Sequence, residues 1–290
     1  MRRACIDIGS NTTRLLVADC ERGSLVELRQ ERAFTLIGRA LGPDGVIPAV
    51  KLAEVVQAVA AQHAVARELG AERIRCVATA AIRRATNGAV LARLIHATCG
   101  GLQLEVLPDA EEARLAFIGA AWGAGAAGEP GLGVIDAGGG SSELVVGDPP
   151  NHVRWWISLP VGSGVVTERW LLADPPTGEQ VDAALRAVRA VVAQAPPPPK
   201  VRRLVAVGGS ATSLRLLAGS RLDAETLDRL LADARRQSAV SFARSFGVDV
   251  QRARLLAGGL VILRAVSEVF DVPLEIGRGG LREGILLDGN

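Results

Sequence analysis

Apolar and polar positions along the chain follow two alternating patterns. Short apolar runs that end in glycine or polar residues predict strands over residues 31–38, 73–84, 102–108, 154–162 and 202–210. Stretches with an apolar residue at every third or fourth position predict helices over residues 51–70, 88–98, 109–122 and 179–193. Further helices are expected up to residue 270, with a last strand and helix in residues 273–289. Strands that alternate with helices predict an α/β fold.

The clearest feature is an internal repeat. The segment IDIGSNTTRLLVAD, from Ile6 to Asp19, matches IDAGGGSSELVVGD, from Ile135 to Asp148, at a constant offset of 129 residues. Each copy predicts a strand, a tight polar turn and a returning strand. A spacing this long does not fit a solenoid and indicates two similar domains. We place their boundary in the glycine-rich and alanine-rich stretch 123–131, giving domains 1–125 and 126–290, with the last helix expected to pack back on the first.

Composition excludes several classes of protein. The net charge is only +2, the aromatic content is 3% and tyrosine is absent, so we expect no nucleic-acid partner. No apolar stretch reaches the roughly 18 residues of a membrane span. The N-terminus has no apolar stretch of the kind found in secretion signals, so we expect a cytoplasmic protein. The four cysteines are scattered and are expected to be reduced structural thiols.

The two polar turns are candidate anion sites. Turns rich in Gly, Ser and Thr expose backbone N–H groups and hydroxyls that bind phosphate. Asp7 and Asp136 end the strands before the two turns, and a carboxylate needs a cation between itself and a phosphate. Mg²⁺ prefers such a mixture of carboxylate and phosphate oxygens. One such turn alone is more simply a glycine hairpin, but two copies with the aspartate favour a ligand site.

Three glutamates are candidates for catalysis. Glu143, on the returning strand of the second repeat, is either a solvated strand carboxylate or part of a site for metal or water. Glu111 and Glu112 lie in the first turn of the predicted helix 109–122, where Asp109 is expected to be the N-cap. Acidic residues favour that helix position for electrostatic reasons alone. The start of a helix beside an interdomain cleft is also where a general base is needed, and only one of the two points inward.

Polar side chains also end two other predicted strands. In TAAIRRATNG, residues 79–88, Arg83 and Asn87 are either in a solvated turn or near a ligand. A third glycine-rich turn, VGGSATSL, runs from residue 207 into a helix and offers free N–H groups. Arg278 and Arg282, between glycines near the end of the chain, either reach the same cleft or cap the last helix.

Seven motifs together resemble one known family. They are DIGSNTTRLL, ATAAIRRATN, EEARLAFIGA, IDAGGGSSELVVG, SLPVGSGVVTERW, VGGSATSL and GLREGIL, which span residues 7–287 in the order and spacing of the exopolyphosphatase and guanosine pentaphosphate phosphohydrolase (Ppx/GppA) family. The resemblance implies a duplicated ribonuclease H-like fold of the actin, hexokinase and sugar-kinase superfamily, with an interdomain cleft for phosphates and a divalent cation. The sequence has no counterpart of the C-terminal helical domain with which long members help to hold polymer, so the resemblance leaves processivity on long polymers open.

The resemblance also implies roles for individual residues. It makes Glu112 the catalytic base and associates Glu143 with metal and water, while Arg83 is expected to stabilise charge on the phosphate. The metal-binding residues are then Asp136 and Glu143, with Asp7. The residues expected to bind phosphate or substrate are Gly9, Ser10, Asn11, Thr12, Thr13, Arg14, Asn87, Gly138, Gly139, Gly140, Ser141, Ser142, Gly208, Gly209 and Ser210.

These observations predict a Mg²⁺-dependent phosphoanhydride hydrolase. We expect it to release terminal phosphate from inorganic polyphosphate, from guanosine pentaphosphate or from both, with water as the acceptor. Two other functions remain open: a kinase of the same superfamily, and a sensor that binds polyphosphate or an alarmone without hydrolysis. The expected partner is polyphosphate or a phosphorylated guanine nucleotide, and the resemblance implies a homodimer.

Overall fold

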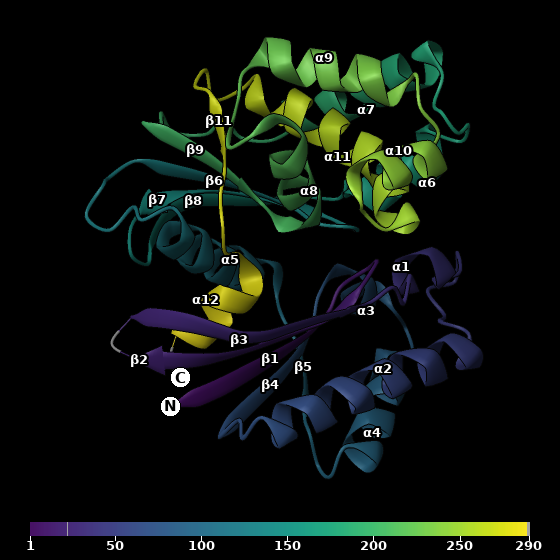
Figure 1. Cartoon of the computed structure of the whole chain (residues 1–290), viewed down its shortest axis with the longest axis vertical. Coiled ribbons are helices and arrows are strands. Elements are labelled where there is room, and N and C mark those ends of the chain that lie inside the picture. The colour runs from purple at the N-terminus through teal and green to yellow at the C-terminus, as the bar shows by residue number, and fades with distance from the viewer. Residues whose placement is uncertain (22, 289–290) are drawn as a thin grey trace. The chain divides into compact units, whose positions relative to one another are not determined.

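The computed structural model describes residues 1–21 and 23–288, and these form two compact units (Figure 1). The first unit contains Met1–Leu115 and the C-terminal segment that starts at Leu281, and the second contains Ala116–Gly280. These units meet along the chain between Leu115 and Ala116, within the helix that precedes the predicted boundary. Each unit is built around one mixed sheet with helices on its faces.

The sheet of the first unit has the strand order β3-β2-β1-β4-β5. Its strands are β1 (Arg2–Ile8), β2 (Thr13–Glu21), β3 (Ser24–Ala33), β4 (Arg73–Ala78) and β5 (Leu104–Val106). β1 to β3 are joined by antiparallel hairpins, while β4 and β5 run parallel to β1. β1 and β4 are central and parallel, and the apolar residues of both strands pack alternately into the two cores on the faces of the sheet.

Helices cover both faces of this sheet. Along the chain they are α1 (Ile37–Ala40), α2 (Ala49–Glu68), α3 (Ala80–Arg84), α4 (Gly88–Thr98) and α12 (Leu281–Leu287), and α5 (Asp109–Gly123) begins in this unit. The apolar faces of α2 and α4 form one core with β1, β2 and β4. On the other face, α12 packs against β1 and β2 through Ile285 and Leu286. The last helix, α12, therefore packs on the sheet with which the chain begins (Figure 1).

The second unit repeats this plan. Its strands are β6 (Leu132–Ala137), β7 (Ser142–Asp148), β8 (His152–Leu159), β9 (Arg203–Val207), β10 (Arg221–Leu222) and β11 (Leu274–Ile276), in the order β10-β11-β9-β6-β7-β8. Its helices are α6 (Ser163–Trp170), α7 (Gly178–Ala193), α8 (Gly208–Ala218), α9 (Ala224–Ala234), α10 (Ala239–Phe246) and α11 (Val250–Ser267). The centre of its core is α11, of which ten residues are buried.

The two sheets confirm the predicted duplication. The order β8-β7-β6-β9-β11 reproduces β3-β2-β1-β4-β5, with β10 as an addition at one edge. In both, the second strand runs antiparallel to the first and the fourth runs parallel to it. This is the ribonuclease H-like order of the actin and hexokinase superfamily, so the predicted fold class is confirmed.

Three element predictions for the first unit were wrong. The third strand ends at Ala33, and α1 occupies the predicted strand residues Ile37 and Gly38, because the preceding Leu36 turns the chain with φ 46°. The strand predicted over residues 73–84 ends at Ala78, and α3 follows. Asp109 is the first residue of α5 rather than its N-cap, since the carbonyl of Pro108 accepts the first helical bonds.

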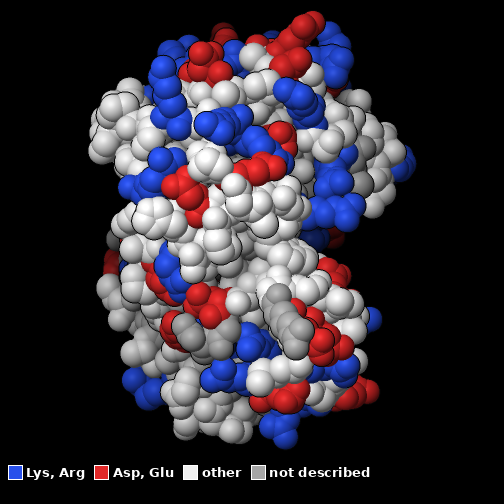
Figure 2. Space-filling model, turned by 90° about the vertical axis from the view of Figure 1, so that its left-hand side faces the viewer, with Lys and Arg blue, Asp and Glu red and all other residues white. Residues whose placement is uncertain are grey.

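Three helix predictions hold. The helix over residues 88–98 has the predicted ends, and the helices predicted over residues 51–70 and 179–193 differ by one or two residues. All four cysteines are free thiols. Among the described residues, no helix is long and apolar enough to cross a membrane. On the face drawn in Figure 2, acidic and basic side chains of the described residues are interspersed, with no broad field of one sign.

Candidate active-site residues

The first glycine-rich hairpin loop, residues 9–12, is fixed through its carbonyl groups. It joins β1 to β2 beside the pair Ile8 and Thr13. The carbonyl of Ser10 accepts a hydrogen bond from Gly38 N (2.8 Å), and that of Asn11 accepts one from Leu36 N (3.0 Å). A Cβ at Gly38 would lie 2.8 Å from the Ser10 Cβ, so only glycine permits this approach. The residues after β3 therefore hold the loop from its carbonyl side.

The second loop, residues 138–141, is held in the same way. It joins β6 to β7 beside the pair Ala137 and Ser142. The carbonyls of Gly138 and Gly139 accept hydrogen bonds from Ser163 N (2.9 Å) and Gly164 N (3.0 Å) at the start of α6. A Cβ at Gly162 would lie 2.3 Å from the carbonyl carbon of Gly139. In the motif SLPVGSGVVTERW, Gly162 therefore allows the start of α6 to lie close to the loop.

The two hairpins differ in the charge behind the loop. In the first, Asp7 on β1 pairs with Arg14 on β2, and in the second Asp136 on β6 pairs with Glu143 on β7, at the same positions of the repeat. Directly opposed unlike charges stabilise a pair of strands, and directly opposed like charges destabilise it. The second hairpin therefore places two carboxylates opposite each other, which favours a cation, whereas in the first hairpin Asp7 lies opposite a positive charge.

Asp7 and Arg14 each carry a buried polar atom without a hydrogen-bond partner among the described residues. These atoms are the Oδ1 of Asp7 and the Nε of Arg14. Burial raises the pKa of the Asp7 carboxyl above its usual value, and the positive charges of Arg282 and Arg14 oppose that shift. Burial also lowers the pKa of the Arg14 guanidinium to about 9, helped by Arg282 and Arg32. This end of the first sheet therefore holds a hydrogen-bond acceptor and a hydrogen-bond donor that no described residue satisfies.

Arg282 does not cap the last helix. Its side chain is buried, with Nη1 3.1 Å from the carbonyl of Leu15 on β2. It thus brings positive charge from the end of the chain to the strand that carries Arg14. The sequence alone left two roles open for Arg282, because the carbonyl that it binds lies 267 residues earlier in the chain.

Glu143 is held by a neighbour on the next strand. It is 1% exposed, and its Oε1 accepts a hydrogen bond of 2.9 Å from the hydroxyl of Ser158 on β8. Ser158 is opposite Glu143 in the strand register. Carboxylates that bind a metal usually also accept a hydrogen bond from a neighbouring residue, which fixes their orientation. Ser158 supplies such a hydrogen bond to Glu143. Sequence reasoning missed Ser158, although its place in the motif SLPVG was a signal.

The predicted third turn is the beginning of a helix. Gly208 follows β9 directly with φ +91° and opens α8, and Gly209 and Ser210 lie in its first turn. A Cβ at Gly208 would lie 2.7 Å from Oδ1 of Asp136, so the glycine gives this carboxylate its place at the end of the neighbouring strand. The carbonyl of Gly209 accepts a hydrogen bond from Arg252 Nη2 (2.5 Å).

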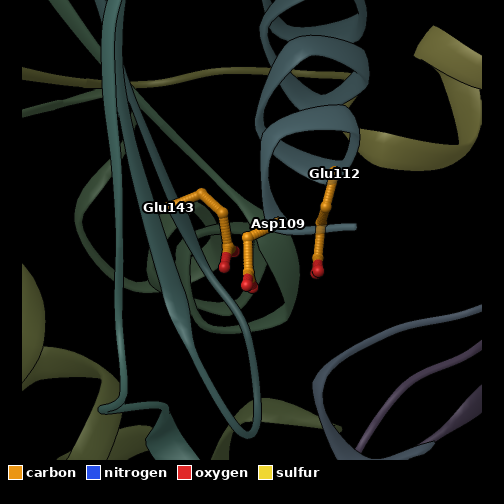
Figure 3. A group of neighbouring side chains, drawn as sticks. All are labelled: Asp109, Glu112 and Glu143. Carbon is orange, nitrogen blue, oxygen red and sulfur yellow. The ribbon is translucent and has the colours of Figure 1, made fainter. Parts of the chain in front are cut away.

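Glu112 and Glu111 have different environments. Figure 3 shows Asp109 and Glu112 on the first turn of α5, and Glu143 on its strand of the second sheet. Glu112 is 7% exposed, and its Oε2 accepts a hydrogen bond of 2.9 Å from Nη1 of Arg83. The neighbouring Glu111 is instead bound to Arg114 (2.8 Å). One carboxylate of the pair is therefore buried beside α3, while the other pairs along its own helix.

Arg83 is occupied by the first unit's own groups. Besides Glu112, its Nη1 donates to the carbonyl of Leu107 (2.6 Å), and its Nη2 pairs with Asp109. The Asn87 amide is also occupied, because it receives a bond from Ile47 N (3.0 Å) and donates one to Ile47 O (2.9 Å). The roles of both residues toward a phosphate remain predictions.

Comparisons with known proteins agree on one family. A sequence model described as the Ppx/GppA phosphatase family matches residues 16–289. The chain is similar to Exopolyphosphatase 2 of Mycobacterium tuberculosis, with 32% identity over 99% of this chain and 97% of that protein. It is also similar to Guanosine-5'-triphosphate,3'-diphosphate pyrophosphatase of Pseudoalteromonas atlantica, with 25% identity over 98% of this chain and 57% of that protein.

Solved structures give the same result. The crystal structure of the Aquifex aeolicus member of the Ppx/GppA family is 29% identical and has a TM-score of 0.82, covering 99% of this chain and 97% of that one. An exopolyphosphatase-like protein is 27% identical with a TM-score of 0.87, covering 99% and 97%. The family match spans almost the whole chain and includes the whole second hairpin, but it begins after the loop of the first. The chain therefore belongs to the Ppx/GppA phosphatase family.

Proposed function

We propose that this protein hydrolyses phosphoanhydride bonds and removes the terminal phosphate from inorganic polyphosphate, from guanosine pentaphosphate or from both. The observation that carries the proposal is the shared construction of the two hairpin loops. In each, the carbonyls are bound from behind by the next helical segment. Loop N–H groups and hydroxyls such as those of Ser10 and Ser141 are then available to phosphate oxygens. The relatives named exopolyphosphatase and guanosine pentaphosphate pyrophosphatase support both substrates.

In this proposal Glu112 is the general base. A carboxylate held by an arginine keeps a fixed orientation, and Glu112 is held by Arg83. Glu112 accepts the proton of the attacking water, while Arg83 orients the carboxylate of Glu112. Glu111 serves as its natural comparison, because it is the adjacent residue with the same functional group but pairs with Arg114.

A divalent cation, which we propose is Mg²⁺, fits the residues of the second hairpin. Asp136 and Glu143 are opposed like charges that a cation would neutralise, and Ser158 orients one of them. The family resemblance assigns Asp7 to the cation as well, and its Oδ1 has no hydrogen-bond partner among the described residues. When bound, Mg²⁺ supplies positive charge to the phosphate oxygens. Arg14 and the two loops bind the remaining phosphate charge.

The other proposals follow the family resemblance. We propose a cytoplasmic homodimer whose partner is polyphosphate or a phosphorylated guanine nucleotide. A kinase of the superfamily would transfer the phosphate to an acceptor other than water, and a sensor would bind without turnover. The buried, arginine-bound Glu112 favours an enzyme over a sensor, since binding alone requires no general base. The relatives named exopolyphosphatase favour water over another acceptor.

The test is phosphate release from polyphosphate of several lengths, from guanosine pentaphosphate and from ATP. We expect release that requires Mg²⁺, stops with a chelator, and falls by about a hundredfold or more in Glu112→Gln. The matched control Glu111→Gln is expected to retain activity, because that carboxylate pairs with Arg114. Binding of polyphosphate without release of phosphate would contradict the hydrolase and support the sensor. Equal losses in both variants would contradict Glu112 as the base.

A further inference from the structure

Gln62 is a buried polar residue on an apolar helix face. It lies on the side of α2 that packs against the first sheet, where Val59 and Ala66 are fully buried. The residue is 3% exposed. Its Nε2 donates a hydrogen bond of 3.0 Å to the carbonyl of Thr13, and its Oε1 has no hydrogen-bond partner among the described residues. Because a buried acceptor without a donor costs free energy, packing alone favours an apolar residue here.

The hydrogen bond fixes the orientation of the amide. Exchanging its oxygen and nitrogen would bring Oε1 against the carbonyl of Thr13, and two acceptors cannot bond to each other. The N–H group must therefore face Thr13, and Oε1 is left in the core. The hydrogen bond from Gln62 to the Thr13 carbonyl is thus made at the expense of folding free energy, because Oε1 stays buried without a donor among the described residues.

That carbonyl lies where the first hairpin loop returns to the sheet. Thr13 is the first residue of β2, directly after loop residues 9–12. Its hydroxyl is 3.1 Å from the hydroxyl of Thr35, and Leu36 binds the carbonyl of Asn11. The segment after β3 therefore holds the loop on one side, and Gln62 holds its return end from α2. No other described hydrogen bond joins the α2 side chains to this hairpin.

We infer that Gln62 is a positioning residue for the phosphate-binding loop of the first unit. The inference rests on the proposed function, in which loop 9–12 binds phosphate. It assigns Gln62 no contact with substrate. When its N–H group is removed, the Thr13 carbonyl loses its hydrogen bond to α2 and the return end of the loop shifts. Small displacements of groups that hold a substrate reduce rate strongly, because the bound geometry must match the reacting one.

The experiment compares Gln62→Met with Val59→Ala. Methionine keeps the length and approximate volume of glutamine but has no N–H group. Val59→Ala loosens the same face of α2, one turn earlier, and removes no hydrogen bond to the hairpin. Each variant is studied by amide hydrogen exchange of peptides covering residues 9–13 and by steady-state kinetics of phosphate release from polyphosphate.

For Gln62→Met we expect faster exchange in residues 9–13 and a value of kcat/KM about tenfold lower, with most of the change in KM, because the loop binds the phosphates. For Val59→Ala we expect lower stability but unchanged kinetics and unchanged exchange in residues 9–13. Equal exchange in both variants, or a lower stability of Gln62→Met with unchanged kinetics, would show that Gln62 has only a structural role. If the wild-type protein releases no phosphate, the proposed function fails, and the exchange comparison still decides whether Gln62 positions the loop.

Discussion

A close backbone contact in the second unit gives a sharp prediction of stability. Gly123 is the last residue of α5, and an added Cβ would lie 1.5 Å from the carbonyl oxygen of Arg278 and 2.3 Å from its carbon. Nearby, a Cβ at Gly279 would lie 2.3 Å from the carbonyl of Gly119. The end of α5 and the segment after β11 therefore pass each other backbone to backbone.

The substitution Gly123→Ala forces this contact apart. Since a Cβ does not approach another heavy atom closer than 3.0 Å, the two backbones must separate by at least 1.5 Å. Overpacking of side chains costs about 1–3 kcal/mol, and here the obstacle is backbone that cannot rotate away. Alanine recovers less than about 1 kcal/mol of helix propensity at a helix end. We expect a loss of about 3 kcal/mol, or a fall in Tm of about 6–12 °C.

The assay is thermal unfolding followed by circular dichroism, with Gly178→Ala as the matched control. A Cβ at Gly178, the first residue of α7, would meet only the guanidinium of Arg235, which can swing aside. We expect that control to differ from wild type by less than about 0.5 kcal/mol. A Gly123→Ala protein as stable as the Gly178→Ala control would refute the reasoning.

Two further predictions concern single side chains. Ser158→Ala removes the hydrogen bond to Glu143, so on the proposed function we expect the half-saturating Mg²⁺ concentration to rise by about tenfold, and an unchanged Mg²⁺ titration would contradict the role of Ser158. Hydrogen bonds from Arg114 hold the pKa of Asp288 below its ordinary value of 3.8, so its contribution to stability is present above that pH and is lost as the pH falls through the lowered pKa. In urea denaturation, Asp288→Asn should therefore be less stable than wild type near neutral pH and equal to it in acid, and a difference that persists in acid would contradict this account.

The sequence predicted what is local and repeated. The hairpins appeared as two copies of strand, glycine turn and strand, and the structure gives both the expected pairing. The helix over residues 88–98 was predicted to its ends because its apolar residues repeat with helical spacing and its flanks are polar. The strand over residues 31–38 failed because Leu36 adopts a left-handed turn, which an apolar run does not signal.

The environment of the candidate site residues was not predictable in the same way. Nothing local to Arg83 shows that it binds Glu112, 29 residues later, and nothing near Asn87 shows that its amide holds Ile47. Gln62 looked like an ordinary polar position of a helix, since its target Thr13 lies 49 residues earlier. Such contacts depend on which strands and helices become neighbours, and the local patterns of a single sequence do not reveal this.

The measurement that tests the central claim most directly is hydrolysis of polyphosphate in water enriched in oxygen-18. The account predicts that each phosphate released by the wild-type protein in a single turnover carries one labelled oxygen, because water attacks the terminal phosphorus. It also predicts that Glu112→Gln releases labelled phosphate about a hundredfold more slowly or worse. Unlabelled phosphate would contradict attack of water on the terminal phosphorus. Transfer of the phosphate to an acceptor other than water would contradict the claim that this protein is a hydrolase.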